Sequence, residues 1–147
     1  DGKFDLCFSC PPYYQVEEYL DYDGNAPEGE LNSIPTYGEF RDTLFAGYKK
    51  GLDALNENCF FVVMTGDSRD KNGAYYGCEA EHEIFFRDQG LSIYNKIVYL
   101  ECEFTRLAHA KVTLNYRKFP KREQKILVFY NGDIDKIHGL YPKIGRL

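Results

Sequence analysis

Two adjacent prolines followed by two tyrosines make up the most unusual segment of the sequence, Ser9-Cys10-Pro11-Pro12-Tyr13-Tyr14. The proline rings fix φ and remove two backbone donors, whereas the carbonyl groups remain, so the turn is stiff and rich in hydrogen-bond acceptors. Tyr13 then places a flat aromatic face at a fixed distance from these carbonyls. A stacking ring beside converging acceptors is the arrangement that a pocket for an extruded nucleobase requires.

A second polar segment, Gly66-Asp67-Ser68-Arg69-Asp70-Lys71-Asn72-Gly73, follows an apolar run. Both segments come directly after predicted strands, and ligands of open α/β sheets bind beyond the carboxyl ends of the strands. We therefore expect the two segments to lie at one edge of a sheet. Asp67, Arg69 and Asp70 could contact a cofactor or DNA there, and a plain solvated turn is an equally good interpretation.

Hydrophobic periodicity predicts the elements that position these segments. A capping box at Thr36 and Glu39 opens a helix whose apolar residues recur every three or four positions, and a second helix is predicted over residues 79–88. Residues 21–35 are typical of a long loop. Apolar runs typical of strands cover residues 4–9, 59–65, 91–104 and 125–130.

The predicted order is strand, helix, strand, helix, strand, strand, which indicates an α/β fold with parallel strands. The last two strands have no helix between them and are expected to pair antiparallel. The 147 residues, of 17.1 kDa, are expected to form one domain. Disorder is excluded because 44% of the residues are hydrophobic, with 13 Tyr and 11 Phe.

The sequence contains no predicted membrane span or signal peptide. The longest uncharged apolar run is Cys59–Met64, whereas a membrane helix needs about 20 such residues. The start, Asp1-Gly2-Lys3, lacks a basic-then-apolar layout and an initiator Met, so we expect the chain to be processed or cut from a longer protein.

The charge is distributed unevenly along the chain. The net charge is −5, yet residues 105–147 hold ten basic and three acidic side chains. A basic segment on an acidic body can orient a polyanion, and a solvated basic face without a partner is the alternative interpretation.

Five cysteines at irregular spacing favour reduced thiols in a cytoplasm over a disulfide framework. Cys7 and Cys10 form a C-x-x-C pair without the second pair of a zinc ribbon, so redox or metal use is not favoured. Cys78 and His82 are four residues apart, but two ligands do not make a zinc site. We expect no metal.

The run Phe4-Asp5-Leu6-Cys7-Phe8-Ser9-Cys10-Pro11-Pro12-Tyr13-Tyr14 resembles motif four of the DNA amino-methyltransferases. In that motif Asp, Asn or Ser precedes Pro-Pro and an aromatic residue. The resemblance extends to a phage-type branch of the family over nearly the whole chain. The further segments that carry it are Glu17-Glu18-Tyr19, Tyr37-x-x-Phe40, Gly66-Asp67-Ser68-Arg69-Asp70-Lys71, Arg117-Lys118 and Ile126–Tyr130.

The resemblance implies a Rossmann-like methyltransferase fold and methyl transfer from S-adenosylmethionine to adenine N6, or to cytosine N4, of a flipped DNA base. A side chain before the first proline and a proline carbonyl would accept the two amino N–H bonds, which aims the nitrogen lone pair at the methyl group. We expect catalytic roles for Cys10, Pro11, Pro12 and Tyr13, and cofactor contacts from Ser9, Cys10 and Asp67. The implied setting is a bacterial or phage-encoded cytoplasmic protein, with restriction–modification as its context.

DNA contact is expected from basic residues that interleave with His109, Tyr116 and Phe119, and from the loop after Gly66. A basic loop without a partner is the alternative. The predicted DNA-binding residues are Arg69, Lys71, Arg117, Lys118, Lys121 and Arg122.

The sequence departs from the family pattern in two places. Cys10 stands where the family has Asp, Asn or Ser, and a thiol is a weak donor and acceptor. The family's Phe-x-Gly-x-Gly cofactor loop is absent, which suggests the catalytic half of a larger enzyme, with the strand at Phe4–Ser9 completed by a missing N-terminal half or by a homodimer. The alternatives are an inactive DNA- or protein-binding remnant of the fold, and an amino-methyltransferase for RNA or protein.

Overall fold

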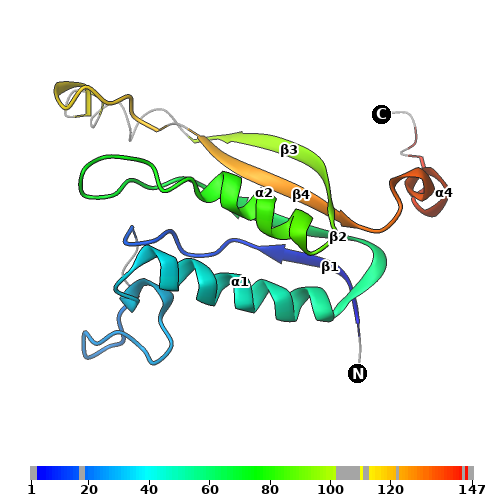
Figure 1. The fold of residues 1–147 in the computed structure, drawn as a ribbon, viewed down its shortest axis with the longest axis horizontal. Coiled ribbons are helices and arrows are strands. Elements are labelled where there is room, and N and C mark those ends of the chain that lie inside the picture. The colour runs from blue at the N-terminus through cyan, green and yellow to red at the C-terminus, as the bar shows by residue number, and fades with distance from the viewer. Residues whose placement is uncertain are drawn as a thin grey trace.

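A computed structural model describes residues 3–16, 19–101, 110, 113–121, 123–143 and 145. Its elements lie in one sheet layer and one helix layer, with a short helical segment at one end (Figure 1). The strands are β1 (Phe4–Ser9), β2 (Leu55–Thr65), β3 (Ser92–Leu100) and β4 (Glu123–Asn131). The helices are η1 (Leu31–Ser33), α1 (Tyr37–Asp53), α2 (Cys78–Asp88), η2 (Ile134–Lys136) and α4 (Ile137–Leu140).

The sheet has the strand order β1-β2-β4-β3. β1 and β2 are parallel, and β4 runs antiparallel to both of its neighbours, β2 and β3. The predicted α/β order and the antiparallel pairing of the last two strands are therefore confirmed. Because β1, β2 and β3 run in the same direction, their carboxyl ends and the start of β4 meet at one edge of the sheet.

Both main helices begin where the sequence predicts. The Thr36 hydroxyl accepts a hydrogen bond from the Glu39 backbone amide at 3.3 Å and donates one to the Glu39 carboxylate at 2.7 Å. This closes the first turn of α1, as expected for a capping box. The helix predicted over residues 79–88 begins one residue earlier, at Cys78.

β2 begins four residues before the predicted start. Asn56-Glu57-Asn58 has the composition of a helix stop, but the strand continues through it. Neighbouring strands satisfy its polar groups, since the Asn56 amide donates to Asp5 at 2.8 Å and the Asn131 amide donates to the Asn56 carbonyl at 3.1 Å. The strand predicted over 91–104 is observed over Ser92–Leu100, and residues 102–104 lie outside the described part of the chain.

The hydrophobic core lies between the sheet and the two long helices. Phe86 of α2 is fully buried, and its ring stacks on Phe129 of β4 at 4.2 Å and contacts Phe61 of β2 at 4.7 Å. Side chains alternate along β2, so that every second residue from Cys59 to Thr65 faces this core. The other buried members of the core are Tyr48, Leu55, Cys59, Val63, Leu91 and Leu127.

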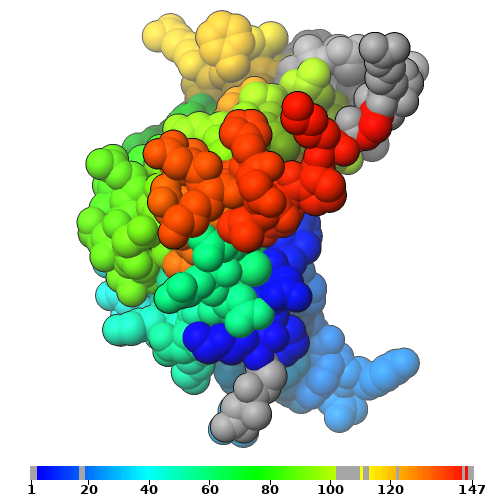
Figure 2. Space-filling model, turned by 90° about the vertical axis from the view of Figure 1, so that its right-hand side faces the viewer, coloured from blue at the N-terminus to red at the C-terminus, as the bar shows by residue number. Residues whose placement is uncertain are grey.

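The opposite face of the sheet carries exposed apolar side chains. Leu6 and Phe8 of β1 are 58% and 59% exposed, whereas Cys7 packs against the core. At the far end of the sheet, Tyr141 donates a hydrogen bond to the Asn58 carbonyl at 2.8 Å, and η2–α4 lies beside the start of β2 and the N-terminal strand (Figure 2). The apolar run of β1 predicts a strand buried on both sides, but within the described residues only its helix-facing side is covered.

None of the helices in the described part of the chain is long and apolar enough to cross a membrane.

Candidate functional site

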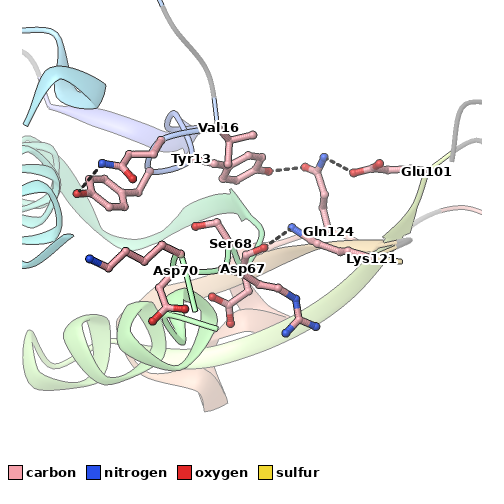
Figure 3. Close-up of a pocket in the computed structure, with 12 residues that line it drawn as sticks. Tyr13, Val16, Asp67, Ser68, Asp70, Glu101, Lys121 and Gln124 are labelled. Atoms are coloured by element: carbon pink, nitrogen blue, oxygen red, sulfur yellow. Dashed lines mark hydrogen bonds between the residues drawn. The ribbon is translucent and has the colours of Figure 1, made fainter. Parts of the chain in front are cut away.

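A pocket of about 650 Å³ lies where β1 and β2 end and β4 begins (Figure 3). We call it the strand-end pocket. It joins the turn after β1, the loop after β2, the residue after β3 and the start of β4. Its lining residues are Tyr13, Tyr14, Gln15, Val16, Asp67, Ser68, Arg69, Asp70, Lys71, Glu101, Lys121 and Gln124.

The Pro-Pro-Tyr segment forms the β1 side of this site. Cys10 is exposed, Pro11 is buried, and Pro12 and Tyr13 are half-buried. Of these residues, Tyr13 lines the strand-end pocket, whereas Pro11 and Pro12 line an adjoining hollow of about 20 Å³ that Tyr13 also borders. The ring of Tyr13 therefore forms the wall between the prolines and the larger pocket.

Tyr14 holds this segment to the rest of the protein. Its side chain is 4% exposed, its hydroxyl donates to the Pro35 carbonyl at 2.7 Å, and its ring packs on Phe40 at 5.2 Å. Tyr37 and Tyr76 complete the cluster and stack on each other at 4.2 Å. Burial and hydrogen bonds to Cys78 and Glu81 raise the pKa of the Tyr37 phenol, so this cluster stays neutral. The sequence gives Tyr14 no role separate from Tyr13, but the structure does.

Tyr13 is held from the other side of the pocket by β4. Its hydroxyl donates to Oε1 of Gln124 at 2.5 Å, and Nε2 of Gln124 donates to the Glu101 carboxylate at 2.7 Å (Figure 3). Sequence reasoning missed both Gln124 and Glu101. Tyr13 and Gln124 are 111 positions apart, so no local pattern could pair them.

Lys121 lies inside the pocket. Its ammonium donates to the Asp67 carbonyl at 3.0 Å and sits over the Tyr13 ring, 5.2 Å from the centroid. Gly66 makes this possible, because a Cβ there would lie 2.2 Å from Nζ of Lys121 and 3.5 Å from Cζ of Tyr13. Lys121, predicted from its charge to contact DNA, thus also borders the ring expected to stack on a base.

Asp67 connects the end of β2 to the start of α2. Its Oδ1 accepts from the backbone amides of Gly77 at 2.9 Å and Cys78 at 3.0 Å. Gly77 is the N-cap residue of α2 and has no side chain with which to cap the helix. The carboxylate therefore supplies the cap and also places negative charge at the positive end of the helix dipole. One oxygen of Asp67, a predicted cofactor contact, is engaged in this way.

We expect Asp67→Ala to lower the free energy of unfolding by about 1–2 kcal/mol, since two amides at the start of α2 lose their acceptor. Urea denaturation followed by circular dichroism measures the change. Asp70→Ala is the matched control, because that carboxylate accepts from Asn72 and Ala74 within an exposed turn. If the two variants lose equal stability, the capping role of Asp67 is wrong.

The loop after β2 is held by local hydrogen bonds and by cations. Backbone amides, Ala74 first, lower the pKa of the Asp70 carboxyl. Arg69 donates to the Gly73 carbonyl at 2.7 Å, and its guanidinium lies 3.6 Å from the centroid of the Tyr75 ring. The loop is thus an ordered turn with cations on its surface.

The remaining predicted DNA contacts lie near this loop. Lys118 reaches it from the segment before β4, because a Cβ on Gly73 would lie 1.9 Å from its Nζ. Arg117 is exposed and adopts a left-handed backbone conformation with φ of 56°. Lys71 is exposed and lines the strand-end pocket. Arg122, like Glu17, Glu18 and His109 of the sequence interpretation, lies outside the described residues.

Ser68 has a polar atom that the described residues leave unsatisfied. Its side chain lines the strand-end pocket and is 9% exposed, and its Oγ has no hydrogen-bond partner. Buried hydroxyl groups in proteins are normally hydrogen-bonded. An orphaned hydroxyl in a pocket wall is consistent with a polar ligand.

A buried polar group lies behind the Pro-Pro-Tyr segment, on the helix side of the sheet. Nδ1 of His82 lies 2.6 Å from the Cys78 carbonyl, and Nε2 lies 3.3 Å from the Tyr48 hydroxyl. Burial raises the pKa of the Tyr48 phenol, and a hydrogen bond to Ser9 opposes this shift. Ser9, a predicted cofactor contact, is thus placed beside Tyr48.

The burial of His82 predicts a pH dependence of stability. Burial lowers the pKa of this imidazole below 6.5 in the folded state, so the unfolded chain binds the proton more tightly. The free energy of unfolding should fall as the pH drops below about 6.5, by about 1.4 kcal/mol for each unit of pKa difference. His82→Gln should flatten this dependence in urea titrations, and His138→Gln, at an exposed site, should not. Equal slopes in wild type and His82→Gln would refute the assignment.

The described residues contain no group of three or more His, Cys, Asp or Glu side chains that could hold a metal ion. Cys7 is half-buried and burial raises its pKa, whereas Cys10 is exposed.

Comparison with known proteins found similarity at the level of structure. No protein-family model and no curated protein matches the chain. TTHA0409 from Thermus thermophilus, described as a DNA modification methylase, matches with a TM-score of 0.62 and 16% identity over 99% of this chain and 49% of that chain. Its complex with S-adenosyl-L-methionine matches with a TM-score of 0.60 and 16% identity, over 99% of this chain and 52% of that chain.

A second DNA methyltransferase has the same architecture. The cytosine-N4-specific PvuII enzyme matches with a TM-score of 0.60 and 20% identity, over 96% of this chain and 49% of that chain. The protein therefore has a partial Rossmann-like methyltransferase fold. The chain spans about half the length of the structures it matches, and at these identities the likeness concerns the fold.

Proposed function

We propose that this chain is the target-base half of an S-adenosylmethionine-dependent DNA amino-methyltransferase acting on adenine N6 or cytosine N4. The observation that carries the proposal is the Pro11-Pro12-Tyr13 turn, which follows the first strand of a methyltransferase half-fold and borders the strand-end pocket. One protein with this fold has been seen with S-adenosyl-L-methionine, and another is named for cytosine N4.

The proposed chemistry needs an exocyclic amino nitrogen to become a nucleophile. The lone pair of this nitrogen is delocalised into the base. Acceptors at Cys10 and at the Pro11 carbonyl would bind the amino hydrogens and favour a tetrahedral nitrogen, while Tyr13 stacks on the base. Bound S-adenosylmethionine supplies an electrophilic methyl group. As the new N–C bond forms, the S–C bond breaks, its electrons stay on sulfur, and the nitrogen loses one proton to solvent.

The residues at the strand ends fit one side of a cofactor site. Cys10 is exposed there, and Ser68 contributes an unsatisfied hydroxyl to the pocket wall. Asp67 has one carboxylate oxygen engaged at α2, and Ser9 is placed beside Tyr48. We therefore propose that the rest of the cofactor site comes from another half of the protein.

The exposed side of the sheet is where we propose that this half binds. β1 is an edge strand, and its Leu6 and Phe8 are mostly exposed. Apolar edge strands pair readily with further strands. A missing N-terminal half would pair with β1 and cover these side chains, and a second copy of the chain is the alternative partner.

Calorimetric titration of S-adenosylmethionine tests the cofactor proposal. We expect micromolar binding by the protein that includes the proposed cofactor half, or by a dimer, and competition by S-adenosylhomocysteine. A folded protein that contains both halves and binds neither compound would contradict the proposal.

DNA binding is proposed to involve the cations beside the strand-end pocket. We expect Arg117→Glu with Lys118→Glu to weaken DNA binding and to lower the slope of log affinity against log salt by up to about two, because each phosphate contact contributes about 0.9. Fluorescence anisotropy at several salt concentrations measures this slope. Lys49→Glu with Lys50→Glu, on the exposed side of α1, is the matched control. No difference between the two double variants would remove the DNA role of residues 117 and 118.

A remnant without catalytic activity is the second candidate function. Cys10 favours it, since a thiol accepts hydrogen bonds from an amino group weakly. Cys10→Ser and Cys10→Asp distinguish the candidates. In an active enzyme these changes alter the rate of methyl transfer, whereas a remnant binds DNA and transfers no methyl group with any of the three side chains.

A further inference from the structure

We propose that Gln124 and Glu101 are positioning residues that hold the Tyr13 ring in place as the surface on which the target base stacks. This inference rests on the proposed function, because it concerns how the same pocket receives a base. Neither residue belongs to the Pro-Pro-Tyr segment. Glu101 directly follows β3, and Gln124 is the second residue of β4.

The polarity of the two hydrogen bonds is fixed by chemistry. An ionised Glu101 carboxylate only accepts, so the NH₂ group of Gln124 must face it across the 2.7 Å contact. The amide oxygen of Gln124 then faces Tyr13 and accepts from its hydroxyl at 2.5 Å. Glu101 thus selects one of the two amide orientations, and that orientation requires a neutral, donating phenol at Tyr13.

This pair of contacts fixes the far end of the Tyr13 side chain. The near end follows two prolines, whose φ angles are restricted. With both ends held, the ring has little freedom to turn about its side-chain bonds (Figure 3). A ring that is ordered before the base arrives costs less conformational entropy on binding than a mobile one. It also keeps the stacked base at one position relative to the Pro11 carbonyl.

The side-chain contacts are separate from those that hold the sheet together. β4 pairs with β3 through its backbone, where Gln124 lies opposite Tyr99 and Glu123 opposite Leu100. The three side chains of the proposed network all line the strand-end pocket. None of them is among the buried hydrophobic core residues. A role in positioning therefore explains these contacts better than a role in the core.

Tyr13 also has a neighbour on one face of its ring. The Lys121 ammonium lies over that face, where it donates to the Asp67 carbonyl. A cation over the face of a tyrosine ring is attracted to its π electrons. A base that stacks on this face must displace the ammonium, whereas the Gln124 contact at the ring edge stays in place.

The test is a double-mutant cycle on base binding. The probe is a short oligothymidylate with one 2-aminopurine, whose fluorescence is quenched when it stacks on an aromatic ring. Gln124→Leu and Tyr13→Phe each remove the hydrogen bond, and we expect each to weaken probe binding by about 3- to 10-fold. The double variant should be no weaker than either single variant, because both changes remove the same contact.

Glu101 provides a conservative variant that distinguishes positioning from bulk structure. Glu101→Gln can still accept from the Gln124 amide and should keep probe affinity within about two-fold of wild type. Glu101→Leu releases that amide and should match Gln124→Leu. Asn95→Leu, on the exposed side of β3, is the control for loss of an amide from the sheet. Urea denaturation of every variant reports whether it folds.

The outcomes separate this inference from the proposed function. Additive losses in the cycle, with Gln124→Leu still weakening binding when Tyr13 is Phe, would overturn the positioning role even if methyl transfer is observed. A non-additive cycle without methyl transfer by the protein that contains both halves would support positioning and overturn the proposed function. No quenching with that wild-type protein would contradict both.

Discussion

Tyr13→Ala is expected to reduce methyl transfer to DNA by at least about 100-fold while leaving the fold intact. Base stacking on an aromatic ring contributes about 1–3 kcal/mol, and a displaced base loses further rate because its amino group no longer faces the acceptors. Tyr13 is half-buried and lies outside the hydrophobic core, so the free energy of unfolding should change little. Radiolabelled methyl transfer and urea denaturation measure the two effects.

Tyr14→Ala is the matched control for this prediction. Tyr14 is 4% exposed and packs against Phe40 and Tyr76, so its loss should lower stability. Adjacent tyrosines are thus expected to give opposite results, one in activity and one in stability. If Tyr13→Ala retained full methyl transfer in the protein that contains both halves, the catalytic assignment of the Pro-Pro-Tyr segment would be refuted.

Phe86→Ala is expected to lower the free energy of unfolding by about 3–5 kcal/mol. The Phe86 side chain is fully buried, and its ring contacts Phe129 and Phe61, so the substitution opens a cavity in the middle of the core. This is a large part of the total stability of a typical domain, about 5–15 kcal/mol. Urea denaturation at neutral pH gives the difference.

Phe8→Ala is the paired variant on the other side of the sheet. Phe8 is 59% exposed, so in this chain alone the same substitution should cost less than about 1 kcal/mol. In a longer protein that covers β1, or in a dimer, the cost should rise. Equal losses for Phe86→Ala and Phe8→Ala in the isolated chain would show that the core does not lie on one side of the sheet.

The order of elements could be predicted because each is set by local chemistry. The capping box at Thr36 and the alternation along Cys59–Thr65 depend on residues close in sequence, and the structure contains both features. The antiparallel β4 follows from the missing crossover helix between the last two strands. The predicted start of β2 was wrong because hydrogen bonds from distant strands satisfy Asn56 and Asn58, which local composition cannot reveal.

The candidate site was predicted in outline and not in its connections. The two segments after β1 and β2 do meet at one sheet edge, as parallel strands require. The contacts of Gln124 and Glu101 come from the other end of the chain and carry no motif of their own. The cap that Asp67 provides for α2 depends on Gly77, ten positions away, and could not be distinguished from a ligand contact by residue type.

The two interpretations of β1 differ for a physical reason. A strand with apolar residues on both faces is typical of a fully covered parallel sheet. Here the described residues cover one face, and the chain corresponds to about half of the methyltransferase structures that it matches. The sequence pattern of β1 is therefore better suited to a larger assembly than to this half alone.

The most direct test of the proposed function is to identify a methylated base. A protein that contains this chain and the proposed cofactor half, or the dimer, is incubated with unmethylated DNA and S-adenosylmethionine labelled in the methyl group. The DNA is then digested to nucleosides and analysed by mass spectrometry. We predict labelled N6-methyladenine or N4-methylcytosine, and its loss with Tyr13→Ala. A folded protein that binds S-adenosylmethionine and DNA but labels neither base would contradict the proposal.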